Sequence, residues 1–161
     1  MTEEERDELV GEYLRYLEYG RLPAELPKSK AEADRLLDDV KHRAETNPFS
    51  DAWETLDELI DTDASEAWNI LLNAVEACDE RDLPLLACGP LETLIWRKHE
   101  EVADRFERQI LQDRRFREAF TYVRMGGVPL VVQRRLNDAL IRTGSDPSML
   151  VEFDENVDDD I

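Results

Sequence analysis

The sequence predicts one all-α domain of about seven to nine helices, arranged as irregular stacked helical hairpins in a HEAT-like manner. The chain has 161 residues, which suits a single domain, and combines 42% apolar with 37% charged residues but only six Gly and seven Pro. Leu, Ala, Glu and Arg are frequent, and this balance favours helices over strands. We expect the domain to span residues 1–147, followed by an acidic tail, residues 148–161, that is mobile or docked.

The first helix is predicted over residues 3–19. Acidic residues fill its first turn, where they suit the positive end of the helix dipole, and Gly20 ends it. Its apolar stripe comprises Leu9, Tyr13, Leu14, Tyr16 and Leu17. Pro23 and Pro27 then predict an extended connector.

A second helix is predicted from a Ser29 cap to about residue 46, because Glu32, three residues after the serine, completes a capping-box pattern. The Asn-Pro pair at residues 47–48 ends it. We expect its apolar stripe to face the core: Ala33, Leu36, Leu37 and Val40.

Residues 51–60 and 65–78 predict a pair of helices joined by a short link that supplies a cap. Trp53 leads the apolar stripe of the first helix and Trp68 leads that of the second. This repetition suggests HEAT-like stacking, in which each helix pair buries its apolar face on its neighbour.

Residues 83–99 form the only long, mostly apolar run, with Gly89-Pro90 at its middle. A short helix over residues 80–87 is expected to end at Gly89, and Pro90 suits the first position of the next helix because it lacks an amide hydrogen. Glu92 would then accept hydrogen bonds from free amides at the start of that helix. We therefore interpret four residues as a helix junction: Gly89, Pro90, Leu91 and Glu92. The helix that begins at Pro90 is expected to end at His99.

Three further helices are predicted over residues 100–111, 113–123 and 130–143, with a glycine-containing turn at 125–129. Trp96, like Trp53 and Trp68, is expected inside the protein. Cys78 and Cys88 lack metal-type spacing with the histidines, so both are predicted to be small buried residues of a reducing compartment.

A family resemblance rests on the segment ACGPLETLI at residues 87–95, a histidine at position 99 and the segment DRRFR at residues 113–117. Together they resemble the DUF6869 family of uncharacterised bacterial domains, which have an A-x-GPLE-x-L-L segment, a nearby histidine and a downstream D-x-x-F-R segment. The resemblance covers roughly residues 50–125 and implies a small all-α bacterial domain without assigning an activity.

The net charge of −19 is distributed unevenly. Residues 1–96 contain nine Lys/Arg against 25 Asp/Glu, residues 97–142 contain 11 against seven, and residues 143–161 contain none against seven. An acidic field repels nucleic acid and speeds encounter with basic partners. Alternatively, the excess of Asp and Glu serves only to keep the protein soluble. The acidic N-terminus and the lack of a membrane-length apolar run favour a soluble, cytoplasmic protein.

The leading hypothesis is a non-enzymatic module that binds a basic protein, such as an immunity or antitoxin-type protein or an accessory subunit of a defence system. The expected docking surface comprises Asp51, Glu54, Asp57, Glu58, Asp61 and Asp63. One alternative is a nucleic-acid mimic that inhibits a DNA- or RNA-binding enzyme. The oligomeric state is left open, and neither direct nucleic-acid binding nor membrane binding is expected.

The rival hypothesis is an enzyme that uses Glu92 and His99. They lie seven residues apart, on one helix face, where a carboxylate and an imidazole could support acid–base chemistry. The capping role of Glu92 and a separation of ~10 Å along the helix argue against it. No third ligand is suitably spaced for a metal, so we expect no metal and no cofactor.

A basic face is predicted from Arg97, Arg105, Arg108 and Arg115. Carboxylates such as Asp104 and Glu107 lie among these arginines, so a solvated, ion-paired surface is favoured over a nucleic-acid site. The acidic tail could also fold back on this basic face and shield it.

Overall fold

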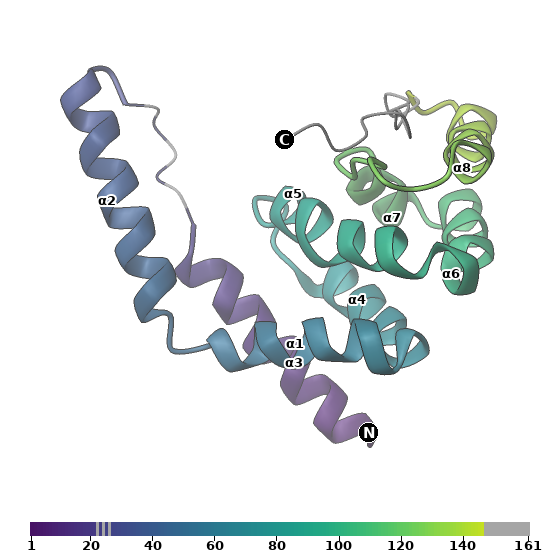
Figure 1. The fold of residues 1–161 in the computed structure, drawn as a ribbon, viewed down its shortest axis with the longest axis horizontal. Helices are drawn as coiled ribbons and strands as arrows, with labels where there is room; N and C mark the ends of the chain where they lie inside the picture. The colour runs from purple at the N-terminus through teal and green to yellow at the C-terminus, as the bar shows by residue number, and fades with distance from the viewer. Residues whose placement is uncertain (22, 24, 26, 147–161) are drawn as a thin grey trace, which may run out of the picture.

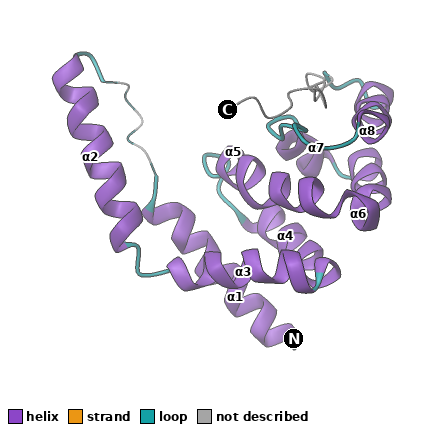
Figure 2. Cartoon of the chain, in the orientation of Figure 1, coloured by secondary structure: helices purple, strands orange, loops and turns teal. Residues whose placement is uncertain are grey.

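The computed structural model describes residues 1–21, 23, 25 and 27–146, and these form helices joined by turns and loops, without a strand (Figures 1 and 2). The predicted all-α class is confirmed. HEAT-like stacking stays a prediction, and the tail lies outside the described residues. The elements are α1 (Glu3–Tyr19), α2 (Lys30–Thr46), α3 (Ser50–Thr62), α4 (Ala64–Ala77), α5 (Leu83–Leu86), a π-helical turn η1 (Ala87–Leu91), α6 (Glu92–Gln112), α7 (Arg114–Phe120) and α8 (Leu130–Arg142).

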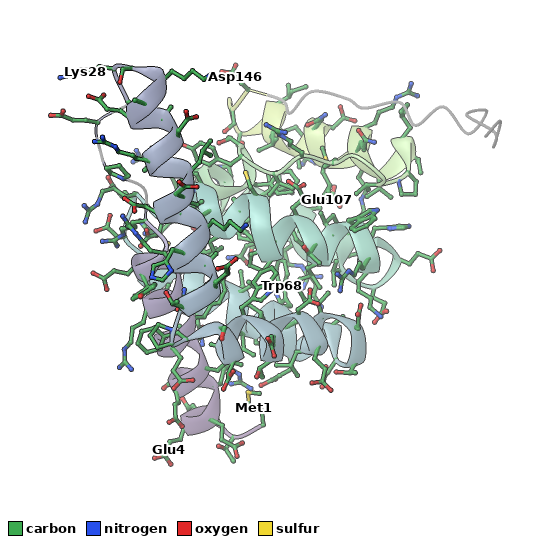
Figure 3. All side chains as sticks on the ribbon, turned by 60° about the vertical axis from the view of Figure 1, so that its left-hand side comes forward. Met1, Glu4, Lys28, Trp68, Glu107 and Asp146 are labelled. Atoms are coloured by element: carbon green, nitrogen blue, oxygen red, sulfur yellow. The ribbon has the colours of Figure 1, made fainter. Side chains whose placement is uncertain are left out.

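The core lies around α4 and α6. Helix α4 packs against α1, α3, α6 and α7, and α6 also packs against α7 and α8. An aromatic cluster of Trp68, Phe106, Phe116 and Phe120 joins α4, α6 and α7, with ring centroids 4.9 to 6.4 Å apart. Figure 3 places Trp68 among the crowded side chains of this body. Aromatic rings supply much of the apolar area buried in such a core, so these contacts fix the three helices on one another.

Side-chain caps define several helix starts. The Ser29 hydroxyl accepts from Glu32 N at 3.2 Å, but the Glu32 carboxylate accepts from Lys28 N and not from Ser29 N, so only the serine half of the predicted capping box forms. Asp63 and Asp113 cap α4 and α7 through their side chains. A complete capping box joins Thr2 to Glu5 at the start of α1.

Helix α2 stands away from the body, on the left of Figure 1, and has no buried residue. Leu37 is 66% exposed, and the other residues of its apolar stripe are only half-buried. The prediction that this stripe faces the core was therefore wrong. The spacing of apolar residues predicts an amphipathic helix but does not say what covers its apolar face.

The junction in the apolar run is a kink between two helical pieces, as predicted. Gly89 has φ −98° and ψ −106° inside η1, between α5 and α6. The helix that follows does not end at His99: α6 continues to Gln112 and is only kinked at Lys98, where φ is −128° and ψ is 23°. The two helices predicted over residues 90–99 and 100–111 are one element.

Two side chains expected inside are at the surface. Trp96 is 52% exposed, and Cys88 is exposed, whereas Cys78 is buried. The indole of Trp96 covers Gly127, where a Cβ would lie 2.3 Å from the ring nitrogen. Trp96 therefore packs on a turn of backbone rather than on the core, and it keeps one side open to solvent.

Candidate functional site

The acidic residues of α3 lie in a long stretch that contains no basic residue. Residues 44–80 contain 11 Asp/Glu and no Lys or Arg. Helix α3 buries Ala52, Leu56 and Ile60, and this turns the opposite side of the helix toward solvent.

On that solvent side, Asp51, Glu54 and Glu58 are exposed. Their spacing of three and four residues places them on one face of the helix. None of the three carboxylates has an ion-pair or hydrogen-bond partner among the residues that the structure describes. We call these three residues the α3 acidic face.

The other three residues of the predicted docking surface have partners within the protein. Arg97 Nη1 lies 3.2 Å from the Asp57 carboxylate and 3.1 Å from that of Asp61. Asp63 caps α4 by accepting a hydrogen bond from Glu66 N at 3.0 Å. The sequence thus located the acidic helix, while only half of the predicted carboxylates remain free to meet a partner.

The four arginines of the predicted basic face have separate roles. Arg97 pairs with α3, Arg105 donates to the Ser65 hydroxyl at 2.7 Å, and Arg115 is directed toward the end of α4. Arg108 is exposed and has no ion pair within the described part of the chain. These arginines are distributed over several contacts, and the tail proposed to cover them lies outside the described residues.

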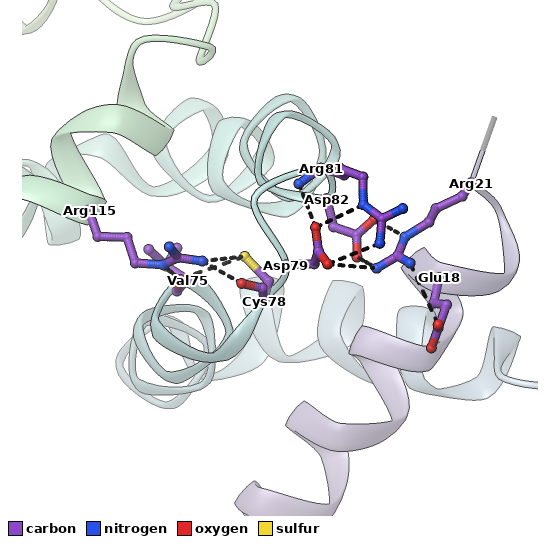
Figure 4. A network of polar contacts seen from close by, with 8 residues as sticks. All are labelled: Glu18, Arg21, Val75, Cys78, Asp79, Arg81, Asp82 and Arg115. Carbon is purple, nitrogen blue, oxygen red and sulfur yellow. Dashed lines mark hydrogen bonds and ion pairs between the residues drawn. The ribbon is translucent and has the colours of Figure 1, made fainter. Parts of the chain in front are cut away.

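Arg115 closes the C-terminal end of α4 (Figure 4). Its Nε donates to the carbonyl of Val75 at 2.5 Å, and its Nη2 donates to the carbonyl of Cys78. The last carbonyls of a helix lack partners within it, and a cation there also suits the negative end of the dipole. Burial raises the pKa of the Cys78 thiol, and the neighbouring Arg115 opposes that rise.

A second network, also in Figure 4, anchors the end of α1. Asp82 is only 2% exposed, and its two oxygens accept from Arg21 Nε and Nη2 at 2.7 and 2.5 Å. Hydrogen bonds from Arg81 lower the pKa of the nearby Asp79 carboxyl, and Arg21 lies 3.9 Å from the same group. Sequence reasoning missed this part-buried pair, because its members lie 61 residues apart.

Glu92 and His99, the proposed catalytic pair, have different partners. The Glu92 carboxylate accepts from Arg124 N at 2.9 Å, across the chain, instead of from amides at the start of its own helix. His99 Nδ1 lies 3.3 Å from the carbonyl of Trp96, and the kink at Lys98 separates the two side chains. The structure does not bring them together. Across residues 1–21, 23, 25 and 27–146, no group of three or more His, Cys, Asp or Glu side chains is arranged to hold a metal ion.

A groove that sequence reasoning did not anticipate lies between α1, α2, α3 and the Gly89 junction. Its volume is about 280 Å³. The rings of Tyr13, Tyr16 and Trp53 stack with centroids 5.9 to 6.5 Å apart. Val40 and Ala44 of α2 line the opposite wall. We call this hollow the α1–α2 groove. Its signal in the sequence is the apolar stripe of α2, which has no core to cover it.

Comparison with known proteins places most of these features in one family. A family model described as a family of unknown function, DUF6869, matches residues 39–142, which is more than half of the chain. The chain belongs to the DUF6869 family. Neither the curated proteins nor the solved structures contain a significant match to the chain.

The DUF6869 match includes the α3 acidic face, the Gly89 junction and the α6–α8 body, while α1 and most of α2 precede it. The α1–α2 groove therefore combines DUF6869 residues such as Trp53 with residues of α1 such as Tyr13. Within the described residues of this DUF6869 protein, every helix is too short or too polar to cross a membrane.

Proposed function

We propose that this protein is a non-enzymatic module that binds a basic protein partner through the α3 acidic face. The observation that supports the proposal most directly is the trio Asp51, Glu54 and Glu58, which is exposed on one helix face without a described partner. Grouped free carboxylates create a negative potential that steers a cationic partner and speeds association.

Arg97 offers an internal example of the expected contact. It approaches the edge of α3 and lies within 3.2 Å of both Asp57 and Asp61. A partner's Arg or Lys would meet Asp51, Glu54 and Glu58 in a comparable way from the solvent side. Such rim pairs add modest affinity but strong charge selectivity.

Within this proposal, the partner is a basic protein such as a nuclease, and the module acts as an immunity or antitoxin-type protein or as an accessory subunit of a defence system. The support is the sign and placement of the charge, together with the separate structural partners of Glu92 and His99. A toxin or nuclease reading frame next to the gene would agree with this role.

The test is affinity capture from the native cell with three baits: the unmodified protein, the α3 variant D51K/E54K/E58K and the control variant E100K/E118K/D138K. The two variants change the net charge equally, and the control residues are exposed and lie in the C-terminal half of the chain. We expect the same basic protein to bind the unmodified and control baits at low salt and to be lost from the α3 variant. Equal capture by all three baits, or no basic protein on any of them, would contradict the proposal.

A competition experiment distinguishes the nucleic-acid-mimic alternative from the proposed function. DNA or RNA would displace the module from the captured partner only if both occupy the same cleft. Displacement would favour a mimic, and unchanged binding would favour a contact outside the nucleic-acid site.

A further inference from the structure

Tyr13 places a polar group in the wall of the otherwise mostly apolar α1–α2 groove. The side chain is 1% exposed, and its hydroxyl would lie 4.0 Å from a Cβ on Gly89, which lines the same groove. No described residue donates to this hydroxyl or accepts a hydrogen bond from it. A buried hydroxyl without a partner is costly, and a bound group that offers an acceptor removes this cost.

The Tyr13 hydroxyl is suited to donate. Burial raises its pKa far above the usual value for tyrosine, and the neighbouring Tyr16 and Cys78 raise it further. The hydroxyl is therefore protonated at neutral pH. The stacked faces of Tyr13, Tyr16 and Trp53 favour a flat, aromatic occupant over a branched aliphatic one.

The α3 side of the groove rim favours positive charge in the partner. Glu45 follows Ala44, and Asp51 and Glu54 lie on either side of Trp53 in the sequence; all three carboxylates are exposed. The basic groups at this rim include Arg43, which donates to the carbonyl of Arg21, and Arg15, whose guanidinium lies 5.8 Å above the ring of Phe49. Lys41, next to Val40, adds a third positive charge, so the cations and carboxylates named here are equal in number, and the negative side of the rim is the α3 side, where Asp51 and Glu54 flank Trp53.

We propose that the α1–α2 groove receives an aromatic side chain of the tyrosine type, presented by the basic protein partner between Lys or Arg residues, with its oxygen accepting a hydrogen bond from Tyr13. This inference rests on the proposed function and specifies its anchor. A volume of about 280 Å³ is roughly that of nine waters, which accommodates one aromatic side chain but not a helix. Interfaces commonly gain most of their affinity from a few residues, and buried aromatic residues inside a polar rim are frequent among them.

The test uses three acetylated, amidated peptides of sequence KKYKK, KKFKK and KKAKK, titrated calorimetrically at low salt. Against the unmodified protein, we expect KKYKK to bind about three- to tenfold more tightly than KKFKK, which is the range for one net hydrogen bond. In Tyr13→Phe this difference should disappear. Because the hydroxyl has no described partner, this substitution should leave the fold intact, which thermal melting checks.

A matched pair of variants tests the location. Ala44→Phe fills the groove, while Ala31→Phe makes the same change at an exposed position of α2 that does not line the groove. The advantage of KKYKK over KKAKK should be lost in Ala44→Phe and kept in Ala31→Phe. Equal binding of KKYKK and KKFKK to the unmodified protein, or a difference that survives in Tyr13→Phe, overturns the inference.

The same peptides separate this inference from the proposed function. If the proposed function holds, D51K/E54K/E58K weakens all three peptides, including KKAKK. D51K/E54K/E58K could weaken all three peptides while the unmodified protein shows no preference for KKYKK. That result overturns the groove as an anchor and still supports binding through the α3 acidic face. A preference for KKYKK that depends on Tyr13, with all three peptides bound as tightly by D51K/E54K/E58K as by the unmodified protein, supports the groove and overturns the proposed function.

Discussion

The Glu92 carboxylate accepts a hydrogen bond from the backbone N–H of Arg124 at 2.9 Å, and this contact joins the start of α6 to the turn after α7. One helical turn further along α6, Trp96 covers Gly127 of the same connection. Two side chains four residues apart therefore hold residues 121–129 against one face of α6. Glu92 is the last residue of the GPLE segment and makes the first of these two contacts. The segment therefore fixes tertiary structure in addition to forming the helix junction.

Replacement of Glu92 tests this contact. Glu92→Ala should lower the free energy of unfolding by about 0.5–1.5 kcal/mol, because the amide of Arg124, at the protein surface, loses a charged acceptor. Glu92→Gln should lose less, because its amide oxygen still accepts. Urea unfolding of the three proteins measures the difference. Equal stability of Glu92→Ala and the unmodified protein would remove the structural role and revive an acid–base role for Glu92.

The close contact between Gly127 and Trp96 predicts that Gly127→Ala is destabilising, and the neighbouring Gly126→Ala is its control. Gly127 has φ +84°, and its Cβ would collide with the indole of Trp96, whereas a Cβ on Gly126 meets no atom within 4 Å. Gly127→Ala should therefore destabilise the protein by about 1–3 kcal/mol, and Gly126→Ala by much less. Trp96→Ala should recover part of the loss in Gly127→Ala. Similar thermal midpoints for the two glycine variants would contradict the close packing.

Arg115 should contribute more to the stability of the fold than the exposed Arg108. Arg115→Ala leaves the carbonyl of Cys78 without its Arg115 donor and that of Val75 with only the weak Cys78 thiol donor at 3.6 Å, and it should cost about 1.5–3 kcal/mol in urea unfolding. Arg108→Ala, which removes an exposed guanidinium without an ion pair in the described residues, should change stability by less than about 0.5 kcal/mol. A loss of the same size in both variants would argue against the helix-end role.

The thiol of Cys88 supplies a prediction about pH. Although the residue is exposed, partial desolvation of its thiol raises the pKa, the negative charge of Glu92 raises it further, and Arg124 opposes the rise. A raised pKa means less thiolate at a given pH, so iodoacetamide should modify Cys88 with a midpoint above that of a free thiol. Glu92→Gln removes a negative charge, which should lower the pKa and speed alkylation at pH 8. Peptide mapping by mass spectrometry separates Cys88 from Cys78, and an unchanged rate in Glu92→Gln would contradict this.

Local signals in the sequence predicted the helices well. Ser29 and Gly20 act within a few residues of their own positions, so the boundaries that they set can be read from short segments. The kink at Gly89 follows for the same reason, since the Gly-Pro pair is a local signal. The acidic character of α3 is also visible in the sequence, because composition is a property of the segment itself.

The contacts that define the candidate site join distant parts of the chain, and the sequence pattern does not contain them. Arg97 neutralises Asp57 and Asp61 from the neighbouring helix α6, which reduces the predicted docking surface to three residues. The apolar stripe of α2 has the same periodicity whether a core or a groove lies beneath it. The exposure of Trp96 follows from the path of a turn some 30 residues later.

The most direct test of the account is an ¹H–¹⁵N NMR titration of the full chain with the KKYKK peptide at low salt. We predict that the largest shift changes occur at Asp51, Glu54 and Glu58 of α3 and at Tyr13 and Ala44 of the α1–α2 groove. These changes should shrink as salt is added. Shift changes confined to α6–α8 or to residues 147–161, with α3 unaffected, would contradict the claim that the α3 acidic face binds a basic partner.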